Sequence, residues 1–127
     1  MYGVDGERRA IARAFGFEAM AVDDAFHYAG FGPKGDLWAT INGSRMLTQL
    51  RAPGAINTRW LTEDIPYGLA AWGRLGAQIG VATPLMDALV TLASVALGQD
   101  FRQSTRTPEQ LGLAGMGVEE MLRFVAG

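Results

Sequence analysis

Residues 83–97, TPLMDALVTLASVAL, decide the fold class of this chain. Thr83 followed by Pro84 is a strong helix start, because threonine is a favoured N-cap and proline is preorganised for the first helical position. The predicted helix over 84–97 has only three polar residues: Asp87, Thr91 and Ser94. A helix with no polar face is typical of the centre of a helical bundle or of a surface beneath a second domain. We therefore expect it to be buried.

The rest of the chain also predicts helices separated by loops. Glycine and proline residues at helix boundaries indicate five further helical segments: 4–15, 22–28, 37–47 (interrupted by Gly43), 66–79 and 118–125. A Thr-Pro-Glu-Gln string at 107–110 has the spelling of a capping box. No stretch alternates like a β-strand. The sequence therefore predicts an all-α fold, a compact bundle of about six or seven helices that forms one domain over 1–127.

Composition and charge exclude several classes of function. The formal net charge is −2, and the 11 basic residues are scattered, so we expect no nucleic acid partner. The chain has no cysteine and only 1 histidine, which leaves no thiol nucleophile and no zinc–thiolate site. The longest charge-free runs, 75–86 and 88–99, fall short of the roughly 20 apolar residues of a membrane-spanning helix. We expect no membrane partner and a cytoplasmic location.

Two features of the sequence, a glycine-rich string and the single histidine, are weak evidence for a functional site. Residues 30–35, GFGPKG, spell G-x-G-x-x-G, the fingerprint of dinucleotide-binding loops. That chemistry needs a strand before the loop and backbone N–H groups at a helix start, whereas 23–29 is predicted to be helical and Pro33 removes an N–H. His27, the one imidazole, sits between two aromatic residues and is expected to be packed rather than catalytic.

The charged cluster in residues 58–68, TRWLTEDIPYG, is the candidate site. In a helix, Arg59 and Glu63 are i, i+4 neighbours, so a surface ion pair with Asp64 as a cap is one interpretation. Pro66 favours another, because it cannot donate to the carbonyl four residues earlier and should break the helix beside both carboxylates. Arginine at such a bend suits bidentate recognition of a substrate carboxylate.

Four strings of the chain carry a resemblance to a known family of enzymes: TRWLTEDIPYGL (58–69), GVATPLMDALVTLASVALGQDF (80–101), RTPEQLGL (106–113) and VDGERRAIARAFG (4–16). With these strings the chain resembles the C-terminal helical domain of the opine dehydrogenases of the octopine/nopaline type. Together they cover nearly the whole chain, and the first is the most specific.

The resemblance implies a two-domain enzyme that binds NAD or NADP in an upstream Rossmann domain and substrate in this helical domain. Its reaction is the reversible reductive condensation of an amino acid amine with a 2-oxo acid such as pyruvate, through an imine that accepts hydride. By the same resemblance, Asp64 orients the catalytic histidine and Arg59 contacts substrate. Glu63 is expected to support Arg59 by pairing with it.

The chain also departs from the family pattern. The family's catalytic histidine lies upstream of the region covered here, and His27 does not match it. The Rossmann domain is absent from the chain, so we expect 1–127 alone to be inactive and to bind no NADH. The alternative is a non-enzymatic helical module, derived from the same fold, for dimerisation or small-molecule binding. A homodimer is expected because related dehydrogenases often associate through helical C-terminal domains.

Overall fold

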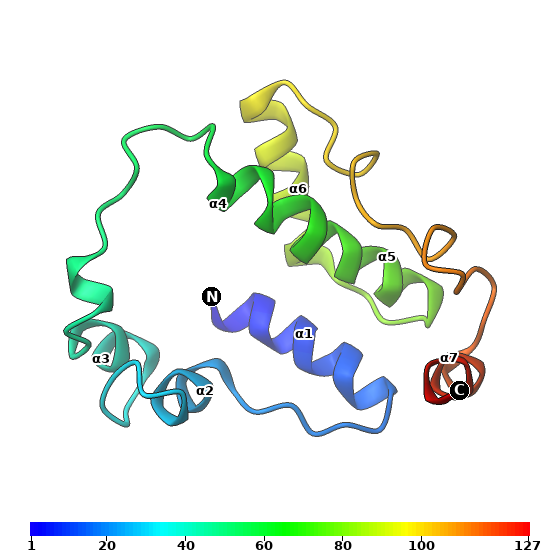
Figure 1. Cartoon of the computed structure of the whole chain (residues 1–127), viewed down its shortest axis with the longest axis horizontal. Helices are drawn as coiled ribbons and strands as arrows, with labels where there is room; N and C mark the ends of the chain where they lie inside the picture. The colour runs from blue at the N-terminus through cyan, green and yellow to red at the C-terminus, as the bar shows by residue number, and fades with distance from the viewer.

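The computed structural model describes residues 1–127, which form helices and connecting loops with no β-strand (Figure 1). The all-α prediction is confirmed. The elements in chain order are α1 (Tyr2–Ala14), α2 (Val22–Tyr28), α3 (Leu37–Asn42), a 3₁₀ turn η1 (Leu47–Gln49), α4 (Arg59–Thr62), a π-helical turn η2 (Ile65–Ala70), α5 (Ala71–Gln78), α6 (Pro84–Leu97) and α7 (Val118–Ala126).

Several helix ends follow from local sequence as expected. Gly16 has φ of +81° and its N–H donates to the Arg13 carbonyl at 2.9 Å, which closes α1 in the left-handed manner that glycine permits. The bounds of α2 and α6 match the predicted ones. The predicted helix over 37–47 is instead two pieces, α3 and η1, because Gly43 ends α3.

The chain does not break at Pro66, and that prediction was wrong. Glu63 and Asp64 keep right-handed helical dihedrals, and α4, η2 and α5 follow one another as a single rod (Figure 1, green). Pro66 has no N–H for the Thr62 carbonyl, and the chain meets this by widening into a π turn. The Tyr67 N–H then donates to the Glu63 carbonyl at 3.1 Å. The two carboxylates therefore lie on a helical surface and not beside a bend.

The core lies between this rod, α6 and the segment after α6. Ala70, Val90, Ala93 and Phe101 form its buried centre, and Phe101 is 0% exposed. Val90 and Ala93 share one face of α6, while Phe101 comes from the loop that follows. The rod is thus fixed from one side, which leaves its other surfaces to carry the charged residues.

Helix α6 is not central within this chain, contrary to the expectation of full burial. Its inner face is buried through Met86, Val90 and Ala93. The outer face remains exposed and is apolar, with side chains of Leu85, Leu89, Leu92 and Val95 that are 40% to 78% accessible. The predicted apolarity of α6 is correct, but only one face has a covering partner in 1–127.

Two acidic residues of α1 bond to other helices. Asp5 and Glu7 are both buried, at 8% and 9% exposure. Asp5 Oδ2 accepts the N–H of Val22, the first residue of α2, at 3.2 Å. Glu7 accepts the N–H groups of Leu85 and Met86 at 2.7 and 2.9 Å. Thr83 occupies the N-cap position of α6, but its side chain makes no capping bond.

The C-terminal segment is held by short local turns. Thr107 and Gln110 form the reciprocal bonds of the predicted capping box, at 3.2 and 3.4 Å, but only a turn follows and not a helix. The Thr107 hydroxyl, and next the backbone N–H of Glu109 itself, lower the pKa of the Glu109 carboxyl. In α7, Met121 is buried while Val125 is exposed, so the apolar side of this helix is only partly covered.

None of the helices has the length and apolarity that crossing a membrane would require.

Candidate functional site

A polar groove lies along the first half of the α4–α5 rod. It has a volume of about 570 Å³. Five residues line it: Arg59, Thr62, Glu63, Tyr67 and Arg106. The first four stand at helical spacing on the rod, on α4, on η2 and at Glu63 between them, so one surface of the rod presents them together. We call this hollow the arginine groove. It collects two guanidinium groups, one carboxylate, one hydroxyl and one phenol.

The predicted ion pair between Arg59 and Glu63 is present. Arg59 Nε donates to Glu63 Oε2 at 2.8 Å, and Nη2 lies 2.6 Å from the same oxygen. The side chains are 86% and 50% exposed, so the pair contributes only about 0.3–0.5 kcal/mol to stability. Its importance is geometric, because both contacts go to one oxygen of Glu63 and leave the other guanidinium donors of Arg59 available for a ligand.

Arg106 enters the groove from a distant part of the chain. Its Cζ atom lies 5.8 Å from the centroid of the Tyr67 ring, a cation–π distance. The preceding residue, Thr105, is 2% exposed and its hydroxyl donates to the Pro66 carbonyl at 2.6 Å. This bond ties the 105–108 segment to the π turn, so the proline that shapes the rod also places the second arginine.

Asp64 lies outside the arginine groove. It is exposed at the start of η2 and makes no side-chain capping bond. The structure thus brings Arg59 and Glu63 together and leaves Asp64 beside them, on the same rod but not in the same lining. Its role toward a catalytic imidazole stays a prediction.

The Gly30–Gly35 loop is bonded to its own chain. It connects α2 to α3, with no strand before it. A Cβ atom at Gly32 would collide with the Thr40 carbonyl, and the Thr40 hydroxyl donates to the Pro33 carbonyl at 3.0 Å. His27 Nδ1 lies 3.0 Å from the Gly32 carbonyl. Pro33 has no N–H, and the N–H groups of Gly30 and Phe31 donate to the His27 and Phe26 carbonyls of α2 at 2.9 and 3.0 Å, so this loop does not fit a pyrophosphate cradle of free backbone N–H groups.

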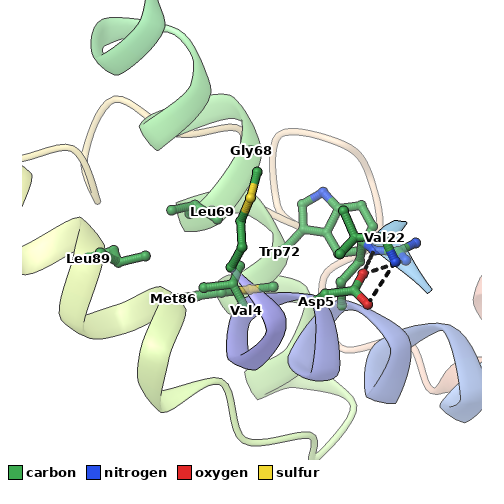
Figure 2. Close-up of a pocket in the computed structure, with 10 residues that line it drawn as sticks. Val4, Asp5, Val22, Gly68, Leu69, Trp72, Met86 and Leu89 are labelled. Atoms are coloured by element: carbon green, nitrogen blue, oxygen red, sulfur yellow. Dashed lines mark hydrogen bonds and ion pairs between the residues drawn. The ribbon is translucent and has the colours of Figure 1, made fainter. Parts of the chain in front are cut away.

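A second hollow, which we call the apolar cavity, opens near the N-terminus and has a volume of about 380 Å³ (Figure 2). Val4, Leu69, Trp72, Met86 and Leu89 are among its apolar lining residues. At one edge, Asp5 pairs with Arg8, whose Nε and Nη2 lie 2.9 and 2.6 Å from Oδ1. The cavity shares no lining residue with the arginine groove.

The aromatic residues near the charged cluster do not all line the arginine groove. Tyr67 lines the arginine groove. Trp72 lines the apolar cavity instead, and Trp60 is exposed outside both hollows. Arg59 and Glu63 themselves face solvent.

Arg106 is the groove residue that sequence reasoning missed. It belongs to the RTPEQLGL string but stands 39 residues beyond Tyr67, with no local pattern that joins them. A lone arginine before a capping box indicates nothing by itself. Only the packing of Phe101 and the Thr105–Pro66 bond bring it to the rod.

Comparisons with known proteins agree with the all-helical fold. A family model for the NAD/NADP octopine/nopaline dehydrogenase alpha-helical domain matches residues 1–97. This range contains α1 to α6 and therefore four of the five residues of the arginine groove; Arg106 lies beyond it.

Individual relatives point the same way. An opine dehydrogenase of Arthrobacter sp. (strain 1C) is 34% identical over 113 residues, which cover 89% of this chain and 32% of the relative. Protein ocs of Agrobacterium vitis is 27% identical over 128 residues, 98% of this chain and 35% of that protein. Vitopine synthase of Allorhizobium ampelinum is 26% identical over 118 residues, 88% of this chain and 31% of that protein. The chain thus spans about a third of the length of these relatives, and it belongs to the octopine/nopaline dehydrogenase family, of which it forms the alpha-helical domain.

Proposed function

We propose that this domain is the substrate-binding half of an NAD- or NADP-dependent opine dehydrogenase. The reaction is the reversible reductive condensation of an amino acid amine with a 2-oxo acid such as pyruvate. The observation that carries the proposal is the arginine groove, in which Glu63 holds the guanidinium of Arg59 beside Tyr67 and Arg106.

The arrangement of charges suits these substrates. An amino acid carries a carboxylate and an ammonium group, and the Arg59–Glu63 pair offers one complementary charge for each. Arg59 has donors that its bond to Glu63 does not use, so it can hold a substrate carboxylate without leaving its partner. Fixing both reactants in one groove would lower the entropic cost of bringing the amine to the carbonyl carbon.

Asp64 would act on a histidine supplied from outside this chain. We propose that its exposed carboxylate accepts the N–H of the catalytic imidazole and so fixes its tautomer and orientation. The free second nitrogen of that imidazole could then exchange a proton with the substrate. Asp64 is available for this role because it is exposed and its side chain makes no capping bond to its own helix.

The cofactor belongs to another domain in this proposal. Because the N–H groups of Gly30 and Phe31 are already bonded to α2 and Pro33 has none, we propose that NADH or NADPH is held by a separate dinucleotide-binding domain and that residues 1–127 alone turn over no substrate. Titration of NADH fluorescence with the purified 127-residue chain is expected to show no saturable binding. Micromolar saturation would mean that this chain holds the cofactor itself.

Arg59→Ala is expected to reduce kcat/KM about 10- to 100-fold for every amino acid tested with pyruvate, in the enzyme that contains this domain. The reason is that a hydrogen bond to a charged group is typically worth about 1.5–3 kcal/mol, and Arg59 would bind a carboxylate that all amino acids share. Steady-state kinetics over a panel of L-amino acids measures this loss.

The exposed Arg51→Ala variant is a matched control, since Arg51 lies in the loop before the rod and outside the groove. It should retain wild-type kinetics. A loss confined to a single amino acid after Arg59→Ala would place Arg59 in a side-chain pocket and contradict the proposed role.

The exposed outer face of α6 favours a second candidate function. A helical module that had lost the chemistry could use Leu85, Leu89, Leu92 and Val95 to dimerise, because such an apolar surface gains stability when it is covered. A concentration-dependent sedimentation coefficient for the purified chain, together with no opine synthesis from any substrate pair, would favour this module over the dehydrogenase.

A further inference from the structure

Arg106 is the one cation of the arginine groove without an acidic partner. The chain contains two ion pairs, Arg8–Asp5 and Arg59–Glu63, and Arg106 belongs to neither. Counting the groove side chains, two arginines face one glutamate, so the groove carries a net charge of about +1. The positive charge of Arg106 therefore favours an anionic ligand in the part of the groove next to it.

The position of Arg106 is fixed by its neighbours in the chain. Thr105 on one side is buried and bonded to the Pro66 carbonyl, and Pro108 on the other side is also buried. The guanidinium lies near the ring of Tyr67, which restricts its directions without using its hydrogen-bond donors. A planar fork held in this way matches the planar oxygens of a carboxylate.

The two arginines differ in the ligand that they suit. Arg59 and Glu63 present both signs of charge within 2.8 Å, which fits a zwitterion such as an amino acid. Arg106 presents positive charge alone, which fits a simple monoanion. The proposed reaction joins one reactant of each kind.

We propose that Arg106 binds the carboxylate of the 2-oxo acid, while the Arg59–Glu63 pair binds the amino acid. This inference rests on the proposed function and deepens it, because it assigns each substrate to its own cation. Arg106 is then a substrate-binding residue that selects 2-oxo acids over uncharged carbonyl compounds.

The first test measures both Michaelis constants in the enzyme that contains this domain. Arg106→Ala is expected to raise the KM for pyruvate about 10-fold and to change the KM for the amino acid less than about 2-fold. Arg106→Lys should recover part of the loss, because the charge remains while the fork is lost. Arg123→Ala, an exposed arginine of α7, is the matched control and should leave both constants unchanged.

The second test uses the purified 127-residue chain and does not depend on turnover. Pyruvate is expected to shift the NMR signal of the Arg106 side chain with a dissociation constant of about a millimolar, whereas pyruvamide, which lacks the carboxylate, should not. Arg106→Ala should abolish saturable pyruvate binding.

The outcomes separate the two claims. Opine synthesis with a pyruvate KM unaffected by Arg106→Ala would overturn the Arg106 assignment and leave the proposed function standing. Arg106-dependent pyruvate binding without opine synthesis from any substrate pair would support the anion site and overturn the proposed function. Pyruvate binding that survives Arg106→Ala, or a rise in the KM of the amino acid alone, would also overturn the assignment.

Discussion

Replacing Asp64 by asparagine is expected to lower kcat about 10²- to 10⁴-fold in the enzyme that contains this domain, as for other carboxylates that fix a catalytic imidazole. The amide keeps the size of the carboxylate but loses its charge, and it can donate where the imidazole also donates. The wrong tautomer would then face the substrate. Steady-state kinetics with saturating substrates measures the loss.

The fold should hardly respond to this change. Asp64 is exposed and makes no capping bond, so the free energy of unfolding is expected to stay within about 0.5 kcal/mol of wild type. Asp100→Asn is the matched control, because Asp100 is also exposed and its one side-chain bond, to the Arg102 N–H, can be made by an amide oxygen. If Asp64→Asn keeps near wild-type kcat, the proposed role of Asp64 is wrong.

The largest expected loss of stability comes from Glu7→Ala, at about 3 kcal/mol. The Glu7 carboxylate accepts two backbone N–H groups at the start of α6, and the variant would leave both without their acceptor in a mostly buried place. Helix α6 supplies Val90 and Ala93 to the core, so its first turn and the core should weaken together. Urea denaturation of the 127-residue chain measures the change.

Glu7→Gln provides a second measurement in case the alanine variant does not fold. Its amide oxygen can accept one of the two bonds, without the charge, and should cost about 1–2 kcal/mol. Glu18→Ala is the control, since Glu18 is exposed in the loop after α1. An unfolding free energy for Glu7→Ala within about 0.5 kcal/mol of wild type would show that the carboxylate does not stabilise α6.

Local signals made much of the fold predictable. Some helix ends depend on residues within about one turn, so the N1 proline Pro84 was sufficient to place the start of α6 and Gly16 the end of α1. The Arg59–Glu63 pair was predictable for the same reason, because i, i+4 neighbours meet on any helix. Three of the four strings that carry the family resemblance lie largely on helices, and the fourth, 106–113, forms turns.

The π turn at Pro66 shows where local rules were insufficient. Proline predicts a break in an α-helix, but the chain can instead widen into a π turn and keep the rod continuous. The Pro66 carbonyl then accepts the Thr105 hydroxyl, 39 residues away. The choice between a break and a π turn was therefore made by packing.

The sequence by itself determined the all-helical fold, the bounds of α2 and α6, and the spacing that pairs Arg59 with Glu63. The tertiary structure determined which group each charged side chain contacts. Glu7 stabilises a helix whose first bonded N–H lies 78 residues away, and Arg106 reaches the ring of Tyr67 from the segment beyond α6. The physical reason is the separation of the interacting residues along the sequence. An i, i+4 pair is set by residues one turn apart. The partner of a buried carboxylate or of a distant guanidinium depends instead on how the helices pack.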